Sequence, residues 1–279
     1  MRDLSGSVVV VTGGARGMGR EYVKGFAAEG AKVVALDVSW EPTGFSGDDD
    51  ESHYRWLEAQ ENVLTVTADI TEDREIAAAY ERALERFGTV DVLINNAGMR
   101  GRDLFPPVGM VTILETKRSD WQRMYESQVF GTVEVTRRFI QPMLQKGSGS
   151  VINVVSGGAW GGRPESREQP YMSAKAAIVN LSFYLATEVK GKNVAVNVLV
   201  PGHTRTTGFD ELQQIRKDAS GRRGPTAVRA DHVVPLALFL AKQDASEGLT
   251  GKAVYAMEWS LLHGYGGFDT WAAPYPDLD

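Results

Sequence analysis

A glycine-rich turn between two short apolar runs constrains the fold of this chain more than any other feature. Residues 7–11 read SVVVV, and residues 32–37 read KVVALD. Short continuous runs that are rich in β-branched residues are typical of strands covered on both faces. Between them, the turn TGGARGMG at residues 12–19 leads into helical apolar spacing that stops at Gly30. This order of strand, turn, helix and strand predicts a βαβ unit.

The position of these glycines predicts a nucleotide-binding site. Without side chains, the turn leaves the amides at the helix N-terminus open to a pyrophosphate. A glycine-rich turn with no ligand is the plain alternative, but the βαβ setting favours the binding site. The turn residues expected to contact the cofactor are Gly13, Arg16, Gly17, Met18 and Gly19.

Asp37 ends the second strand, twenty residues after Gly17. A carboxylate here accepts hydrogen bonds from the ribose hydroxyls of an adenosine and repels a 2′-phosphate, so it selects NAD over NADP. Arg16 would favour NADP if its side chain met that phosphate. An arginine that is merely solvated on the turn is an equally good interpretation of this residue. Direct repulsion at the ribose outweighs a mobile arginine, and NAD is therefore the predicted cofactor.

The alternation of strands and helices continues along the chain. Further strands are expected at residues 63–69, 90–94, 150–156, 193–200 and 253–257, and helices at 71–87, 119–146, from 171 onward and at 230–241. Residues 39–61 are expected to form an acidic surface loop with a short helix at 54–61. Residues 203–230 are expected to form a lid over the substrate, and residues 258–279 a C-terminal tail. No repeat or linker interrupts the pattern, which predicts one α/β domain over residues 1–279, a doubly wound parallel sheet with helices on both faces.

Small and polar residues follow the expected strands at their C-terminal ends. Asp69 ends the third strand, NNAG at residues 95–98 follows the fourth, and Ser156 ends the fifth. Ligands of open α/β sheets bind at this edge. A lone serine here is more often a helix cap, but Tyr171 follows fifteen residues later on the next helix.

Tyr171 and Lys175 stand four residues apart in a segment with helical apolar spacing, so they share one helix face. A neighbouring ammonium favours the phenolate and lowers the pKa of a tyrosine. A tyrosine with such a pKa exchanges a proton with a substrate oxygen near neutral pH. Alone, the pair would be read as solvated neighbours, and the preceding features supply the context for a catalytic role.

Composition excludes several classes of function. The net charge of −6 and the pI near 5.4 argue against nucleic acid or an anionic membrane as the main partner. The chain has no cysteine, no visible signal peptide and no apolar run of membrane-spanning length, which suits the cytoplasm. Four scattered histidines predict no metal site, and the acid run at 48–51 is expected to be solvated.

These motifs resemble those of the classical short-chain dehydrogenases/reductases, and the match runs from about Leu4 to about Met257. It rests on TGGARGMG at 12–19, NNAG at 95–98, Ser156, YMSAK at 171–175 and PGHTRT at 201–206. The resemblance implies a Rossmann-type sheet of about seven strands, a nicotinamide cofactor and a homo-oligomer, a tetramer or dimer. It places the catalytic serine, tyrosine and lysine on Ser156, Tyr171 and Lys175. It also implies cofactor contacts at Asp69, Ile70, Asn96, Ala97, Gly98, Pro201, Thr204 and Thr206.

Three departures from the family pattern are visible. The long helix usually carries an asparagine seven residues after its tryptophan, and counted from Trp121 that place holds Gln128, which is expected to relay protons through water from a shifted position. The loop between Ser156 and Tyr171 is slightly long and holds Trp160, Arg163 and Arg167, which favours a bulky or anionic substrate. The last strand runs into Ala-Met-Glu-Trp at 256–259 in place of the common Val-Asp-Gly-Gly.

The predicted function is that of a NAD-dependent oxidoreductase acting on a secondary alcohol or ketone. Tyr171 is the expected general acid/base, Ser156 binds the substrate oxygen, and Lys175 lowers the pKa of Tyr171 and holds the nicotinamide ribose. Two alternatives stay open: a NAD-binding regulator without activity, and a lyase or epimerase on the same fold.

Overall fold

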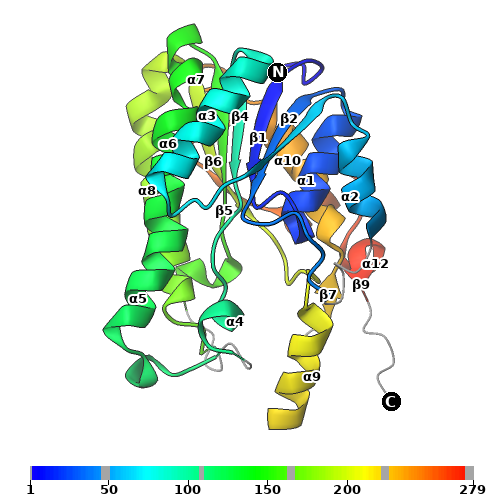
Figure 1. The fold of residues 1–279 in the computed structure, drawn as a ribbon, viewed down its shortest axis with the longest axis vertical. Helices are drawn as coiled ribbons and strands as arrows, with labels where there is room; N and C mark the ends of the chain where they lie inside the picture. Colours follow the sequence, from blue (N-terminus) through cyan, green and yellow to red (C-terminus); the bar gives the residue numbers. More distant parts are fainter. Residues whose placement is uncertain (1, 45–50, 107–109, 162–166, 221–225, 274–279) are drawn as a thin grey trace.

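The structure is a computed structural model, and it describes residues 2–44, 51–106, 110–161, 167–220 and 226–273. Within these ranges, seven strands form one parallel sheet in the order β3-β2-β1-β4-β5-β6-β8 (Figure 1). Their bounds are β1 (Val8–Thr12), β2 (Lys32–Asp37), β3 (Val63–Thr67), β4 (Val92–Asn95), β5 (Gly149–Val154), β6 (Val194–Val200) and β8 (Ala253–Tyr255). The predicted doubly wound sheet is therefore confirmed.

The winding direction of the chain reverses at β1, which pairs with β2 on one side and with β4 on the other. Val11 lies opposite Ala35 of β2 and opposite Ile94 of β4. The connection that leaves β1 and the one that leaves β4 cover opposite faces of the sheet, so they diverge at the C-terminal edge. A crevice opens where the two connections part, and ligands of such sheets bind there.

Alternate residues of β1 belong to two separate cores. Val9 and Val11 pack in the core on one face, while Val8 and Val10 pack in the core on the other, and all four are at most 1% exposed. Side chains alternate across a strand, so a strand covered on both faces needs apolar residues at every position. The continuous valine run is explained by this double coverage.

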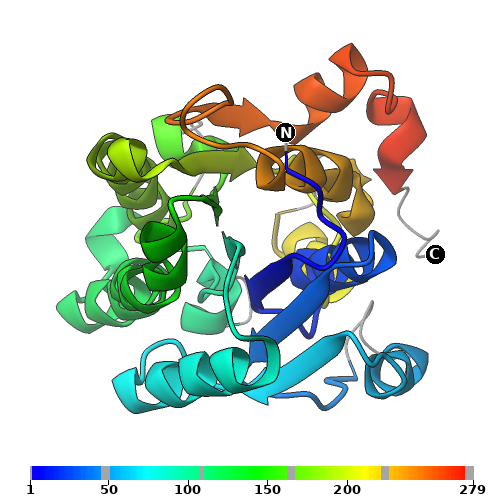
Figure 2. The ribbon, with the colours of Figure 1, turned by 90° about the horizontal axis from the view of Figure 1, so that it is seen from above.

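Helices cover both faces, as Figure 2 shows from above. The first core is completed by α1 (Gly17–Ala28), α2 (Glu51–Glu58), α10 (Val234–Ala241) and α11 (Ala256–Leu262). The second is completed by α3 (Asp73–Phe87), α6 (Gly131–Phe139), α7 (Gln141–Lys146) and α8 (Tyr171–Val189). Among the helices of the described ranges, none is both long enough and apolar enough to cross a bilayer.

The single long helix expected at 119–146 is wrong in one respect, because it is interrupted. It consists of α5 (Arg118–Tyr125), a π-helical turn η2 (Glu126–Phe130), α6 and α7. Pro142 is the second residue of α7. A π-helical turn widens the helix locally and is frequent at functional sites. Gln128 lies in this turn.

Several segments lie beyond the C-terminal edge of the sheet, in the lower half of Figure 1. They include α4 (Gly101–Leu104), the 3₁₀ turns η1 (Ile113–Glu115) and η3 (Gly157–Trp160), and α9 (Phe209–Ser220). The expected lid segment at 203–230 thus contains a helix and the short strand β7 (Ala227–Val228). In the expected acidic loop, α2 begins at Glu51, three residues before the short helix expected there, and residues 48–50 of the acid run lie outside the described residues.

The C-terminal segment differs from the expected strand at 253–257, because β8 ends at Tyr255 and α11 begins at the next residue. It continues through α12 (Phe268–Trp271) to β9 (Ala272–Ala273), which pairs antiparallel with β7. The backbone N–H of Arg229 donates to the Trp271 carbonyl at 2.8 Å, and the Arg229 guanidinium lies 5.1 Å from the Trp271 ring centre. The described part of the tail therefore packs on its own chain, against the base of the lid segment.

Candidate active site

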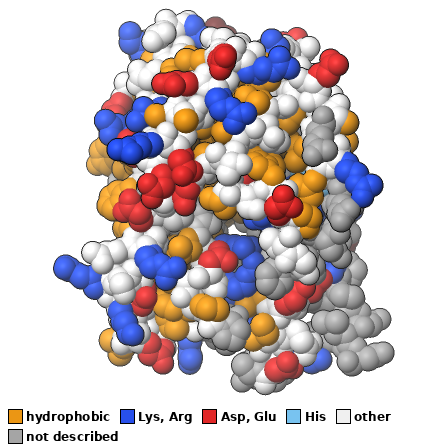
Figure 3. Space-filling model, in the orientation of Figure 1, with side chains coloured by type: hydrophobic (Ala, Val, Ile, Leu, Met, Phe, Trp, Pro, Cys, Tyr) orange, Lys and Arg blue, Asp and Glu red, His pale blue; other side chains and the backbone are white. Residues whose placement is uncertain are grey.

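A cavity of about 1220 Å³ lies at the C-terminal edge of the sheet. It extends from Asp37 at the end of β2, past the glycine turn, to Tyr171 at the start of α8. Figure 3 shows this face of the molecule hollowed between the sheet layers and the segments below them. The volume exceeds the ~300–1,000 Å³ of ordinary small-molecule pockets, so the cleft has room for a ligand of dinucleotide size.

The glycine turn has a backbone that side chains would obstruct. Gly13 and Gly17 have φ angles of +69° and +52°, in the left-handed region that glycine adopts without strain. A Cβ at Gly19 would fall 1.8 Å from the carbonyl oxygen of Gly13. One at Gly17 would lie 3.3 Å from the side chain of Thr206, on the opposite wall. The glycines of the turn thus leave bare backbone opposite Thr206, a setting that suits a pyrophosphate.

Asn96 holds this turn in place. Its carboxamide donates to the carbonyl oxygens of Thr12 at 3.0 Å and Gly13 at 3.3 Å. The hydroxyl of Thr12 in turn accepts the N–H groups of Asn96 and Ala97, each at 3.0 Å. The Asn96 amide, an expected cofactor contact, therefore ties the end of β4 to the glycine turn, and Asn96 lines the cleft at the same time.

Asp37 and Arg16 lie together at the far end of the cleft. The Asp37 carboxylate accepts N–H groups of Ala15 at 3.0 Å and Val38 at 2.8 Å, and it lies 3.9 Å from the Arg16 guanidinium. Burial raises the pKa of Asp37, and these N–H groups and Arg16 oppose that shift. Arg16 also donates to the carbonyls of Ser39 and Glu41. It is therefore anchored beside Asp37 at the edge of the cleft.

The other expected cofactor residues line the same cleft. They are Gly13, Gly17, Met18, Asp69, Ile70, Ala97, Gly98, Pro201, Thr204 and Thr206, while Gly19 lies behind the turn. Asp69 is also a local cap, since its carboxylate accepts the N–H and the hydroxyl of Thr71, both at 2.8 Å. Gly131 lets α6 approach this strand end, because a Cβ there would lie 2.6 Å from the Ile70 carbonyl.

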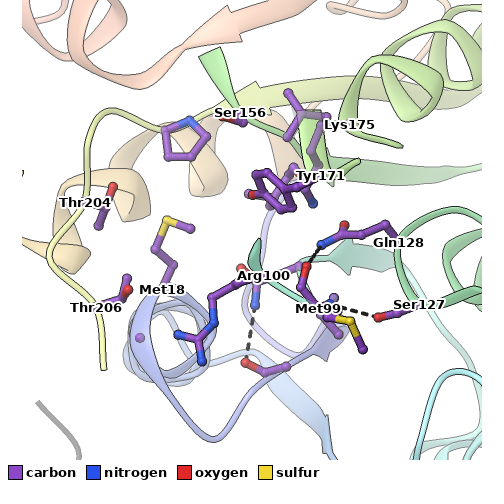
Figure 4. A pocket seen from close by; sticks show the side chains of 18 of the residues that line it. Met18, Met99, Arg100, Ser127, Gln128, Ser156, Tyr171, Lys175, Thr204 and Thr206 are labelled. Atoms are coloured by element: carbon purple, nitrogen blue, oxygen red, sulfur yellow. Dashed lines mark hydrogen bonds between the residues drawn. The ribbon is translucent and has the colours of Figure 1, made fainter. Parts of the chain in front are cut away.

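Ser156, Tyr171 and Lys175 meet at the other end of the cleft, as Figure 4 shows. Ser156 follows β5 and caps η3, while the other two lie on the first turns of α8. Lys175 is 6% exposed, its Nζ donates to the Val154 carbonyl at 2.9 Å, and it lies 5.8 Å from the centre of the Tyr171 ring. Side chains far apart in the sequence therefore line the same cleft as the glycine turn.

The pKa of Tyr171 differs from the sequence-based expectation in direction. Burial, with a smaller contribution from the Glu168 carboxylate, raises the pKa of Tyr171 from 10.0 to about 12, and Arg100 opposes the shift. Burial also lowers the pKa of Lys175 from 10.5 to about 8. The expected lowering by Lys175 is not met here, because its Nζ is directed to the Val154 carbonyl and lies above the ring.

Gln128 is 2% exposed and occupies a defined place beside the same wall. Its Nε2 donates to the carbonyl of Met99 at 2.6 Å, and Ser127 Oγ accepts the N–H of Met99 at 2.9 Å (Figure 4). Both main-chain groups of residue 99 are therefore held by the π-helical turn. The Gln128 Oε1 atom is buried, and no group of the described residues donates a hydrogen bond to it.

Several contributors to the cleft were not predicted from the sequence. Arg100 pairs with Asp103 at 3.1 Å and donates to the Thr207 carbonyl at 3.3 Å, and Arg216 of α9 lies 3.6 Å from Glu168. The Arg100–Thr207 and Arg216–Glu168 contacts join segments that are distant in the chain, and no local motif marks them. Of the loop residues expected to border the substrate, Arg163 lies outside the described residues.

His232 is a further residue that the sequence did not reveal. It is 0% exposed, its Nδ1 lies 2.6 Å from the Arg229 carbonyl, and its Nε2 accepts the N–H of Gly202 at 3.3 Å. Burial lowers the pKa of His232 to about 4. The neutral ring thus fixes the Pro-Gly turn that lines the cleft.

A parallel sheet wound in both directions from β1, with a glycine turn and a Ser-Tyr-Lys group in one cleft, defines the class of dinucleotide-binding α/β oxidoreductases. The family model for short chain dehydrogenases matches residues 7–217. The chain therefore belongs to the short-chain dehydrogenase family.

Curated relatives and solved structures agree with this membership. The chain is 42% identical over 278 residues to fluoren-9-ol dehydrogenase of Terrabacter sp. (strain DBF63), across 96% of this chain and 76% of that protein. It is 31% identical over 244 residues to 3-alpha-(or 20-beta)-hydroxysteroid dehydrogenase of Mycobacterium bovis, across 87% of this chain and 85% of that protein. Among solved structures, the chain matches 3-ketoacyl-(acyl-carrier-protein) reductase from Brucella melitensis complexed with NADH. The TM-score is 0.72 at 28% identity, and the match covers 90% of this chain and 97% of that one.

Proposed function

We propose that this protein is a NAD-dependent oxidoreductase that interconverts a secondary alcohol and its ketone, with Tyr171 as the general acid/base. The observation that carries the proposal is the shared cleft, in which Ser156, Tyr171 and Lys175 face the same space as the glycine turn. Such a cleft brings a proton-transferring side chain to the place where a dinucleotide would present its reactive ring.

The residues of the cleft fit a dinucleotide from one end to the other. The glycine turn and Thr206 would hold the pyrophosphate, Asp37 the adenosine ribose, and Asp69 with Ile70 the adenine. Lys175, Pro201 and Thr204 would hold the nicotinamide end. Bound NAD would supply the acceptor or donor of the hydride. Because the Asp37 carboxylate lies where a 2′-phosphate would be repelled, we propose NAD rather than NADP.

The chain's own groups would move the proton. In oxidation, the Tyr171 oxygen takes the proton of the substrate hydroxyl, and the Ser156 hydroxyl donates a hydrogen bond to the substrate oxygen. Burial favours the neutral phenol of Tyr171, so oxidation requires a positive charge that favours the phenolate. Lys175, 5.8 Å from the ring centre, would supply this charge once its Nζ turns from the Val154 carbonyl towards the phenol oxygen. In reduction, the same phenol gives its proton back. Gln128 shapes the adjacent wall through Met99.

The names of two relatives support a cyclic secondary alcohol as the substrate. Fluoren-9-ol dehydrogenase and 3-alpha-(or 20-beta)-hydroxysteroid dehydrogenase are both named for alcohols on ring systems. The wide cleft between α9 and the sheet is consistent with a bulky substrate, and residues 203–230 would act as its lid.

We also propose that the protein is a homo-oligomer. Phe130 of η2 and Leu181, Phe183 and Tyr184 of α8 are exposed by 54%, 40%, 37% and 66%, and the two elements pack together. Exposed apolar groups that gather on neighbouring elements are typical of interfaces. Light scattering on the purified chain would give the mass of the assembly, and a monomer would contradict the proposal.

A panel of secondary alcohols and ketones tests the proposed function. The protein is assayed with NAD or NADH by absorbance at the nicotinamide band, and NADP or NADPH is run in parallel. We expect turnover of cyclic secondary alcohols with NAD. Binding of NADH without turnover of any member of the panel would favour the regulatory alternative, and a clear preference for NADP would overturn the cofactor assignment.

A further inference from the structure

Methionines are concentrated in the cleft. The chain has eight methionines, and five of them line the cavity: Met18, Met99, Met110, Met172 and Met257. Of the other described methionines, Met124 and Met143 are 0% exposed in the cores. Met18 belongs to the glycine turn, and the remaining four cavity methionines come from four separate segments. This convergence is not explained by the cofactor contacts.

Two of these thioethers occupy space that glycines leave free. A Cβ at Gly158 would lie 2.6 Å from the Sδ of Met172, and one at Gly202 would lie 3.3 Å from the Cγ of Met257. Met172 follows Tyr171 directly on α8, and Met257 stands in the first turn of α11. The wall is therefore built to admit long, unbranched side chains beside the reacting groups.

The other two thioethers are held through the main chain. Met99 is fixed by Ser127 and Gln128 at its N–H and carbonyl groups. Met110 precedes Val111, whose N–H donates to the Arg167 carbonyl at 2.9 Å, close to the start of α8. Contacts of the main chain at residue 99, and next to residue 110, therefore fix where these two side chains start.

Aromatic rings stand at the same side of the cleft. Tyr255 lines the cavity and is 40% exposed, and its ring centre lies 5.6 Å from that of Trp160, which is 46% exposed. The charged groups beside Tyr171 are paired with each other, Arg100 with Asp103 and Arg216 with Glu168. The methionines and aromatic rings make this wall apolar and polarizable. Because its charged groups pair with each other, they do not require an ionic substrate.

We propose that the substrate is a secondary alcohol, or its ketone, whose carbinol carbon is bonded directly to flat aromatic rings. The thioethers of Met99, Met110, Met172 and Met257 would contact those rings. A thioether is polarizable and flexible, and it makes favourable contacts with aromatic rings that a saturated ring system does not offer. The carbinol carbon would lose its hydrogen as hydride to NAD and its hydroxyl proton to Tyr171, which leaves the ketone. The inference rests on the proposed function and adds discrimination between aromatic and saturated rings of equal size.

Inhibitor binding separates ring recognition from chemistry. Fluorene and its fully hydrogenated analogue have the same carbon skeleton and no hydroxyl group, so neither can react. We expect fluorene to inhibit alcohol oxidation at least tenfold more strongly than the saturated analogue. The variants Met172→Leu and Met257→Leu keep the volume and the apolar character but remove the sulfur. Each variant should weaken inhibition by fluorene roughly two- to tenfold and change inhibition by the saturated analogue by less than about twofold.

Met143→Leu is the matched control, because it makes the same exchange in a core outside the cleft. It should leave both inhibition constants unchanged. Equal inhibition by the two hydrocarbons, or parallel loss of both in the leucine variants, would overturn the inference. If no alcohol is turned over, the proposed function fails instead, and the intrinsic fluorescence of fluorene still reports whether the cleft prefers the aromatic skeleton.

Discussion

Gln128 and Gly98 are in direct contact, since a Cβ at position 98 would fall 2.5 Å from the carboxamide of Gln128. The glycine of the NNAG segment therefore makes room for the longer amide that replaces the family's usual asparagine. The same carboxamide donates to the Met99 carbonyl at 2.6 Å. A residue expected to relay protons is engaged in holding the wall of the cleft.

Shortening this amide distinguishes the two roles. In Gln128→Asn, the amide is one methylene shorter and no longer reaches the Met99 carbonyl. We expect the KM of the alcohol to rise about fivefold, as for the loss of a hydrogen bond of ~1 kcal/mol, with kcat changed little. Steady-state kinetics of Gln128→Asn and Gln128→Leu measure this. A proton relay would give the opposite split, with kcat preserved in the asparagine variant and reduced in the leucine variant at constant KM.

The contact with Gly98 predicts a non-additive pair of substitutions. Gly98→Ala alone should lower the free energy of unfolding by about 1–3 kcal/mol, because its Cβ overlaps the Gln128 carboxamide. In a Gln128→Ala background the overlap is gone and only the strain of a side chain at φ +156° remains, so the same change should cost less. Denaturant unfolding of the four proteins of this double-mutant cycle gives the coupling energy. Equal costs in the two backgrounds would show that residue 98 is constrained by something other than Gln128.

Removal of the Tyr171 hydroxyl tests the assignment of the proton donor and acceptor. Tyr171→Phe should reduce kcat by about 10²–10⁴-fold, the range of general acid–base contributions. NADH binding, followed by fluorescence titration, should stay within about twofold. Tyr184→Phe makes the same change on the exposed face of α8 and serves as the control. Substantial turnover in Tyr171→Phe would contradict the assignment.

Asp37 is expected to set the choice of cofactor. Asp37→Asn keeps an oxygen that accepts the Ala15 N–H and removes the negative charge. The ratio of kcat/KM for NADP to that for NAD should rise at least tenfold, because the repulsion of a 2′-phosphate is lost. Arg16, anchored beside Asp37, is then adjacent to an added phosphate. In the double variant Arg16→Ala/Asp37→Asn, part of this gain should disappear. An unchanged ratio in Asp37→Asn would remove the basis for the NAD assignment.

Local patterns were sufficient to predict the sheet and the meeting of Ser156, Tyr171 and Lys175 in one cleft. The valine run of β1, the glycine turn and the Tyr171–Lys175 spacing each depend on neighbours within one or two elements. The interruption of the long helix was not predictable, because α5, η2 and α6 have continuous helical composition, and the contact of the π-helical turn with Met99 joins residues 29 apart in the chain.

The pKa of Tyr171 shows a second limit of sequence patterns. Spacing places Lys175 beside the ring but does not reveal that the Val154 carbonyl receives its Nζ, or that burial dominates the pKa. The end of β8 at Tyr255 and the pairing of β9 with β7 likewise depend on contacts between distant segments. Such contacts carry no periodicity in the sequence.

His232 predicts how stability depends on pH. Burial lowers its pKa from 6.5 to about 4, so the unfolded chain takes up a proton at a higher pH than the folded protein does. The contribution of the neutral ring is complete above pH 6.5 and is lost as the pH falls through 4, by up to about 3 kcal/mol. Protonation would also remove the acceptor for the Gly202 N–H, which fixes a wall of the cleft.

Comparison of two histidine variants isolates this effect from the carboxylates that titrate in the same range. His232→Phe should be less stable than the parent at pH 7 and should lose less stability between pH 6.5 and 4. His263→Phe, on the exposed end of α11, should keep the parent's pH dependence. Urea unfolding at half-unit pH steps gives the free energy of unfolding for all three proteins. If the parent and His232→Phe change in parallel, the ring at 232 is not the group that links protonation to folding, and the neutral imidazole does not hold the Pro-Gly turn.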